Sequence, residues 1–112
     1  MRSAMAANFL VALEAAASKL TATAGVTREQ LAPLVLATAR QWAELGPERA
    51  LTGPIARGDA ATVRKHLDAL ASEPATRALY AALSLAAVEL ARGNGTSDEA
   101  LGEIRRALLA DR

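Results

Sequence analysis

Apolar residues recur every three to four positions along most of this sequence, and that period predicts helices. The first run continues from near the N-terminus to about Ala24, and Gly25 is suited to the left-handed conformation that ends many helices. Its expected buried stripe comprises Phe9, Leu13, Ala16, Ala17 and Leu20. No alternation of apolar and polar residues typical of strands is present, so the chain is predicted to be all-α.

A second helix is expected to begin after Thr27, because Thr27 and Gln30 have the spacing of a capping box. Pro33 lies beyond the first turn and predicts either a kink or a later start of the helix. The helix should end before Pro47, which opens a short turn of its own. Its expected buried face comprises Leu31, Leu34, Val35, Thr38 and Trp42.

Three apolar runs predict the helices of the second half. The run 60–71 has Val63, Leu67 and Leu70 on its inner face. The run 75–92 is the most apolar, and its expected buried stripe comprises Leu79, Leu83, Ala86, Ala87 and Leu90, with Leu85 and Val88 widening it. The last run follows a second capping box, Thr96 with Glu99, and its inner face comprises Leu101, Ile104 and Leu108. We expect a compact bundle of about five helices that forms a single domain over 1–112.

The segment 51–59, Leu-Thr-Gly-Pro-Ile-Ala-Arg-Gly-Asp, is a long stretch with no helical apolar pattern. Gly53 and Gly58 permit backbone angles that other residues avoid, and Pro54 fixes its own φ. Asp59 stands where the N-cap of the next helix is expected. The segment therefore predicts a stiff loop with one cation, Arg57, and such loops are where binding residues concentrate.

Composition excludes several classes of partner and chemistry. The chain is 52% hydrophobic but 3% aromatic, which indicates a core of Ala, Leu and Val. A net charge of +1 favours neither nucleic acid nor an anionic membrane as a partner. There is no Cys, and the single His has no partners at metal-ligand spacing, so no metal site is expected. Asn8 and Glu14 interrupt the N-terminal apolar run, which argues against a signal peptide and favours a soluble, cytoplasmic protein.

Several short segments together resemble one known domain. They are Asn8-Phe9-Leu10, Leu45-Gly46-Pro47, Leu51 to Asp59, Thr62-Val63 and His66-Leu67. The resemblance covers about 4–92 and is to the helical C-terminal domain, of unknown function, of a group of Rossmann-like oxidoreductases. These are relatives of 6-phosphogluconate dehydrogenase, ketopantoate reductase and pyrroline-5-carboxylate reductase.

The resemblance implies a cofactor and partners. In that group NAD(P) and substrate lie in a cleft between the helical domain and a preceding dinucleotide-binding domain, and related members pair through their helical domains. This sequence contains no Gly-x-Gly-x-x-Gly motif after a strand. We therefore expect an excised, truncated or separately encoded half of such an enzyme. It would hold no cofactor alone, form a homodimer, and need a Rossmann-type partner for NAD(P).

Two residues are catalytic candidates. The resemblance implies that Asn8 orients a substrate carbonyl or hydroxyl, whereas its alternative is a surface position near a helix end. His66 would serve as a general acid if it faces the cleft, and otherwise as a partly buried, hydrogen-bonded histidine.

The binding candidates lie in the loop. Arg57 would bind a carboxylate or phosphate through its planar guanidinium, or would pair with Asp59 and hold the loop. Asp59, as a cap, would compete with an anion for the helix amides. Thr52, Gly53 and Pro54 would allow close approach of nicotinamide or substrate, or would serve the turn alone.

These features lead to two hypotheses of different classes. In the first, the chain is the substrate-side and dimerisation domain of an NAD(P)-dependent oxidoreductase that acts on a small carbonyl or imine, and it is inactive alone. In the second, it is a stand-alone interaction module whose surplus apolar surface, on the first and fourth long helices, docks another chain. Whether the chain itself is an enzyme stays open.

Overall fold

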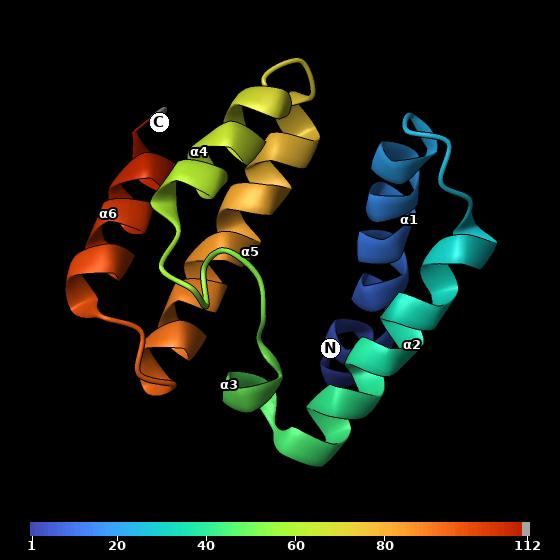
Figure 1. Ribbon diagram of the computed structural model, residues 1–112. Coiled ribbons are helices and arrows are strands. Elements are labelled where there is room, and N and C mark those ends of the chain that lie inside the picture. The colour runs from blue at the N-terminus through green and yellow to red at the C-terminus, as the bar shows by residue number, and fades with distance from the viewer. Residues whose placement is uncertain (111–112) are drawn as a thin grey trace. The chain divides into compact units, whose positions relative to one another are not determined.

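The computed structural model describes residues 1–110 and is helical, with no strand among them. In chain order, a π-helical turn η1 (Ala4–Asn8) continues into α1 (Phe9–Ala22), which is followed by α2 (Arg28–Leu45) and the short α3 (Pro47–Ala50). The loop 51–59 leads to α4 (Ala60–Ala69), α5 (Pro74–Gly93) and α6 (Asp98–Leu109) (Figure 1). The prediction of an all-α fold with five long helices is confirmed.

The helix boundaries follow local hydrogen-bonding groups. After α1, Gly25 adopts φ +78° and Val26 N–H donates to the Thr21 carbonyl at 3.0 Å, the bond of a Schellman motif. The predicted capping box is present, because Thr27 N–H donates to Gln30 Oε1 at 2.9 Å and Gln30 N–H to Thr27 Oγ1 at 3.2 Å. Each of these groups would otherwise leave a backbone donor or acceptor at a helix end without a partner.

Two details of the boundaries differ from the predictions. α2 begins at Arg28 and runs through Pro33, so the late start that was one alternative for this helix is excluded. Ser97, and not Thr96, caps α6, since Ser97 Oγ accepts from Ala100 N–H at 3.2 Å. The Thr96 hydroxyl instead donates to the carbonyl of Ala56, 40 residues earlier, at 2.8 Å.

The chain divides into two compact units, Met1–Arg40 and Gln41–Arg112, which we call the N-terminal unit and the C-terminal unit. In the C-terminal unit α6 packs against α4 and α5, and α3 contacts α5. Its core comprises Ile55, Ala60, Val63, Leu67, Ala81, Val88, Ala91, Leu101, Ile104 and Leu108. The inner faces predicted for α4 and α6 are confirmed. That residues 1–112 form a single domain stays a prediction.

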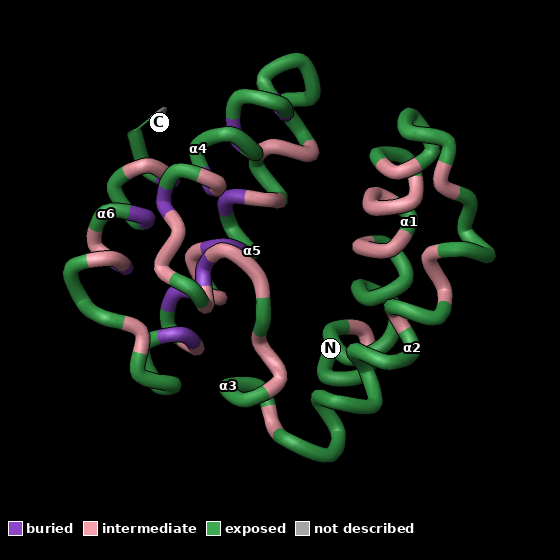
Figure 2. Tube along the Cα trace, viewed as in Figure 1, coloured by how far each residue is buried: buried purple, intermediate pink, exposed green. Residues whose placement is uncertain are grey.

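The N-terminal unit has no such core. No residue before Ile55 is buried, and the buried segments in Figure 2 are confined to the loop before α4 and to α4–α6. Of the stripe predicted for α1, Leu13, Ala16 and Ala17 are half-buried, but Phe9 and Leu20 are exposed.

The buried faces predicted for α2 and α5 need correction. Trp42 was interpreted as core, but it is 61% exposed, and Leu34 and Thr38 of the same predicted face are exposed as well. On α5, Leu79, Leu83 and Ala86 of the predicted stripe are exposed, whereas Ala87 and Leu90 are half-buried and Val88, expected at its edge, is buried. The buried positions are Ala81, Ser84, Val88 and Ala91, because small residues let α5 approach α4 and α6 closely.

Candidate functional site

The loop 51–59 is held by its own backbone and by α6. Ile55 is buried in the core, and Asp59 N–H donates to the Pro54 carbonyl at 2.8 Å. The Thr96 hydroxyl donates to the Ala56 carbonyl from the turn before α6. A loop fixed at both its middle and its end costs little further ordering when it binds a ligand, and these contacts are the ones that a stiff loop requires.

The two glycines of the loop differ in what excludes a side chain at their positions. Gly58 has φ +70°, and a Cβ there would lie 2.9 Å from the Cβ of Ala100 on α6, so both conformation and space exclude a side chain. Gly53 has φ +90°, but a Cβ there would meet no atom within 4 Å. The position of Gly53 is thus explained by turn geometry, and Thr52 beside it is exposed.

Asp59 is the N-cap of α4, as the sequence predicts. Its Oδ1 accepts from Thr62 N–H at 3.1 Å, and its Oδ2 accepts from the Thr62 hydroxyl at 2.6 Å. These two bonds from Thr62, with the charges of Arg57 and Lys65, hold the pKa of the Asp59 carboxyl below its ordinary value. Because the carboxylate occupies the N-terminus of α4 and accepts from the Thr62 amide, it competes with an anionic ligand for this helix end.

Arg57 is the cation of this loop, and its side chain is 63% exposed. The Arg57 Nη2 atom lies 3.9 Å from Asp59 Oδ2, which is a long ion pair in solvent and therefore weak. The predicted ion pair between Arg57 and Asp59 is therefore present but weak. Its fork of donors remains accessible to a carboxylate or phosphate, which is the chemistry that the loop offers.

His66 lies on α4 and is exposed, so the interpretation as a partly buried histidine is wrong, although its hydrogen bond is present. Its Nδ1 is 3.0 Å from the hydroxyl of Tyr80 on α5, and the two rings meet edge to face with centroids 5.7 Å apart. Burial raises the pKa of Tyr80, and a hydrogen bond with Ser84 opposes that rise. Tyr80 was missed from the sequence, because nothing local links it to a residue on the preceding helix.

Asn8 is the last residue of η1 and is exposed, and its side chain makes no capping bond to α1. It belongs to the N-terminal unit, whereas the other six candidates belong to the C-terminal unit. Of these six, the structure brings five together in the loop, and His66 follows on the helix that Asp59 caps. That Asn8 and His66 share a cleft with the loop stays a prediction.

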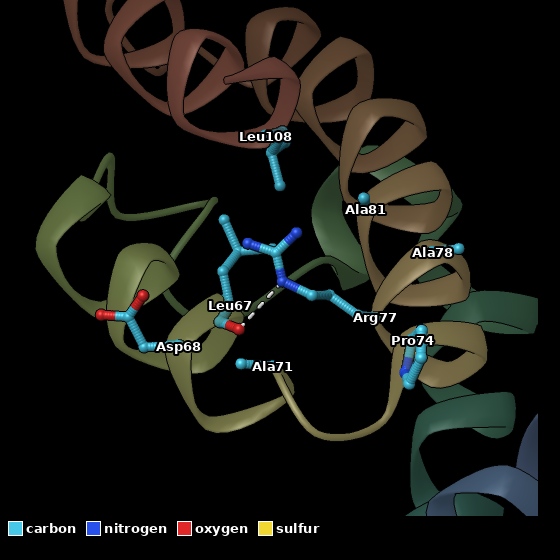
Figure 3. A pocket seen from close by; sticks show the side chains of 8 residues that line it. All are labelled: Leu67, Asp68, Ala71, Pro74, Arg77, Ala78, Ala81 and Leu108. Atoms are coloured by element: carbon cyan, nitrogen blue, oxygen red, sulfur yellow. Dashed lines mark hydrogen bonds between the residues drawn. The ribbon is translucent and has the colours of Figure 1, made fainter. Parts of the chain in front are cut away.

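The C-terminal unit also has an open hollow of about 820 Å³, which contains none of these candidates. It is lined by Leu67, Asp68, Ala71, Pro74, Arg77, Ala78, Ala81 and Leu108. Figure 3 shows the Arg77 side chain reaching across it, with Nε donating to the Leu67 carbonyl at 3.1 Å. Apart from Asp68 and Arg77 the lining is apolar, and the arginine ties α5 to the end of α4.

Among 1–110, no three His, Asp or Glu side chains gather where they could hold a metal ion. No helix in this part of the chain is both long enough and apolar enough to cross a membrane.

Comparison with protein families gives a match over residues 1–87 to a domain of unknown function, DUF2520. The chain belongs to the DUF2520 family. The matched region includes the whole loop 51–59 and ends within α5, so α6 lies outside it. A comparison with curated proteins and one with solved structures found no match. The expectation of a helical domain of unknown function is confirmed.

Proposed function

We propose that this DUF2520 chain is the substrate-side and dimerisation domain of an NAD(P)-dependent oxidoreductase. One observation carries the proposal: no residue before Ile55 is buried, although that part of the chain is rich in large apolar side chains. The exposed ones are Met1, Met5, Phe9, Leu10, Val11, Leu20, Leu34, Leu36, Trp42 and Leu45.

An exposed apolar surface of this extent is expected to bind a partner chain. Ordering each residue of a helix costs about 1–2 kcal/mol of backbone entropy, and in proteins the packing of an apolar face supplies most of what offsets it. In α1 and α2 that face is half-covered at best, with Leu13, Leu31 and Val35 its least exposed large residues. A second copy of the chain is a partner that brings an apolar surface of the same kind.

The oxidoreductase part of the proposal is supported by the resemblance to the helical halves of Rossmann-type enzymes and by membership of DUF2520. The accessible guanidinium of Arg57 suits an anionic group on a small substrate. In the complete enzyme Asn8 and His66 would border the same cleft, and the reaction would be hydride transfer to a carbonyl or imine.

The described residues do not fit a dinucleotide on their own. Asp59 occupies the N-terminus of α4, and the loop offers one cation for a pyrophosphate with two charges. NAD(P) is therefore assigned to a Rossmann-type domain or subunit, and the isolated chain is expected to leave NADPH fluorescence unchanged. A reading frame beside this one that encodes a strand, a Gly-rich turn and a helix would identify that partner.

Sedimentation equilibrium over a range of concentrations tests the association. We expect a dimer, and we expect Arg57→Ala to leave it intact because Arg57 lies in the loop. Co-expression with the neighbouring Rossmann-type protein should then give NADPH oxidation with a small keto acid. Arg57→Ala should raise KM for that substrate by about 10- to 100-fold, the value of a charged hydrogen bond. A monomer at all concentrations would rule out the dimerisation role.

The same exposed surface favours one alternative, a stand-alone interaction module. A dimer whose gene has no Rossmann-type neighbour, and whose Arg57→Ala variant behaves as the parent in every assay, would support the module instead.

A further inference from the structure

The single histidine of the chain is paired with its single tyrosine inside the C-terminal unit. His66 lies on α4 and Tyr80 on α5, and these two helices contact each other. The Nδ1 atom of His66 is 3.0 Å from the Tyr80 hydroxyl, and the two ring planes are inclined at 82°. A hydrogen bond and an edge-to-face contact from the same neighbour together fix the orientation of the imidazole ring.

The tyrosine is itself held by the core. Tyr80 is half-buried, and Ser84, one turn further along α5, is 5% exposed and is the one buried polar residue among 1–110. Burial raises the pKa of Tyr80, and the hydrogen bond from Ser84 opposes that rise, which is the effect of a donor to the phenol oxygen. Ser84, Tyr80 and His66 therefore form a short hydrogen-bonded chain that leads from the core to an exposed imidazole.

The chemistry of these groups decides which of them donates to which. A hydroxyl has one proton to donate and can accept on its oxygen at the same time. Because Ser84 donates to the phenol oxygen, the proton of Tyr80 is available to Nδ1 of His66. An imidazole nitrogen is also a stronger base than a phenol oxygen, which favours the direction O–H···N over N–H···O. Nδ1 is then the acceptor, and the proton of the neutral imidazole lies on Nε2.

The Nε2 atom is the part of the ring that a ligand can reach. His66 is exposed, and among residues 1–110 its Nε2 has no protein hydrogen-bond partner. His66 follows Thr62 by four residues and lies on the same side of α4, the side on which Thr62 binds the loop residue Asp59. A protonated Nε2 donates to an oxygen that gains negative charge, whereas a bare Nε2 would accept a proton. The tautomer therefore decides the role of the histidine.

We propose that Tyr80 is a positioning residue: its hydroxyl donates to Nδ1 of His66 and holds the neutral imidazole as the Nε2–H tautomer, which offers a donor to the carbonyl oxygen of the substrate. This inference rests on the proposed oxidoreductase function and adds a residue to it. Reduction of a carbonyl places negative charge on the oxygen, and a donor oriented in advance stabilises that charge. His66 is thereby assigned as a hydrogen-bond donor and not as a base.

Nitrogen-15 NMR of the full chain measures the tautomer directly. His66 is the only histidine in the sequence, so one pair of ring-nitrogen signals reports on it. At about pH 9, above the range in which histidines ordinarily titrate, Nδ1 should have the shift of an acceptor nitrogen and Nε2 that of an N–H. The ratio of Nε2–H to Nδ1–H should be about 3- to 10-fold higher in the parent than in Tyr80→Phe, the contribution of one hydrogen bond.

Two further variants make the NMR result specific. Ser84→Ala keeps the phenol but removes its donor, and it should lower the ratio by a smaller factor than Tyr80→Phe. Leu79→Ala is the matched control, since Leu79 is the neighbour of Tyr80 on α5 but is 38% exposed, and its ratio should equal that of the parent. Amide signals of α6 verify that each variant is folded. An Nδ1–H tautomer in the parent, or an equal ratio in Tyr80→Phe, would overturn the inference and leave the proposed oxidoreductase in place.

Kinetics of the co-expressed enzyme test whether Tyr80 acts through His66. Tyr80→Phe should lower kcat by about 3- to 10-fold with KM unchanged, whereas Arg57→Ala acts on KM. His66→Gln keeps an N–H donor but has no Nδ1, so adding Tyr80→Phe to it should change kcat no further. An undiminished effect of Tyr80→Phe in that background would overturn the positioning role. Failure of the parent assembly to oxidise NADPH would instead refute the proposed function, and with it the donor role of His66, even where the tautomer is as expected.

Discussion

The two units of this chain have similar apolar compositions but differ in whether they form a buried core. Both are rich in Ala and Leu, but eleven apolar side chains are buried among residues 41–110 and none among residues 1–40. In the C-terminal unit three helices and a loop meet around Val63, Leu101 and Ile104, all fully buried. In the N-terminal unit η1, α1 and the first part of α2 supply too few faces to enclose any residue. Apolar content alone therefore does not create a core, because a core requires enough elements to surround it.

The largest expected contrast is in amide hydrogen exchange. In the chain diluted until it is monomeric, amides of α6 should exchange through global unfolding and be slowed by about 10⁴-fold or more. Amides of α1 should be slowed by about 100-fold at most, because no tertiary core holds that helix. Equal protection of α1 and α6 would show that the N-terminal unit is stable by itself, and the contrast would disappear.

Truncation of a core side chain should show the same contrast in stability. Ile104→Ala removes a fully buried side chain, and we expect it to lower the free energy of unfolding by about 2–5 kcal/mol. Leu36→Ala, at an exposed position of α2, should change it by less than about 0.5 kcal/mol in the monomer. Chemical denaturation measures both. A large loss with Leu36→Ala in the monomer would mean that α2 has a core contact.

The two loop glycines give a comparison between a tightly packed and an open position within the C-terminal unit. Gly58→Ala should destabilise by about 2–3 kcal/mol, since it combines a positive φ with a contact to Ala100 that is too short. Gly53→Ala meets the same positive φ but no nearby atom, so we expect it to lower the free energy of unfolding by only about 1 kcal/mol. Equal effects in thermal denaturation would indicate that the loop moves away from α6 without cost.

The smallest effect concerns the charge of Asp59. Its folded-state pKa is lowered, so its contribution to stability is fully present above the unfolded-state pKa of about 4 and is lost as pH falls through the folded value. Asp59→Asn keeps a capping oxygen but removes the charge. The parent should therefore lose stability relative to the variant below about pH 4. Parallel curves of melting temperature against pH would exclude a role for the carboxylate.

Local hydrogen-bonding signals in the sequence were reliable, whereas the choice between similar apolar faces was not. Thr27, Gln30, Gly25 and Asp59 do what their types and spacing predict, because each acts on atoms within a few residues. The prediction that Thr96 caps α6 was wrong, because the Thr96 hydroxyl donates to the Ala56 carbonyl. Sequence spacing cannot reveal a partner 40 residues away.

The error on α5 has a physical reason. Its leucine row is more apolar than its alanine and serine row, and hydrophobicity alone favours burial of the leucines. Close packing against α4 and α6 required the smaller face, which left Leu79 and Leu83 outside. The prediction for Trp42 was wrong as well, because an aromatic residue at helical spacing does not by itself identify a buried position, and Trp42 is exposed.

The candidate site was foreseen in part. The cap at Asp59 and the accessible cation at Arg57 followed from residue types within nine positions. The partnership of His66 with Tyr80 did not, since it joins two helices across 14 residues.

The boundary of family similarity cuts through the folding unit. The DUF2520 match ends at residue 87, inside α5, and α6 beyond it supplies Leu101, Ile104 and Leu108 to the core. A fragment limited to the matched region would leave Val63 and Leu67 without their covering helix, and it should aggregate. Any relative that folds with the matched region alone must cover α4 with a segment other than α6. In such relatives, the residues that correspond to Ala60, Val63 and Leu67 should differ as well, because they would contact that other segment.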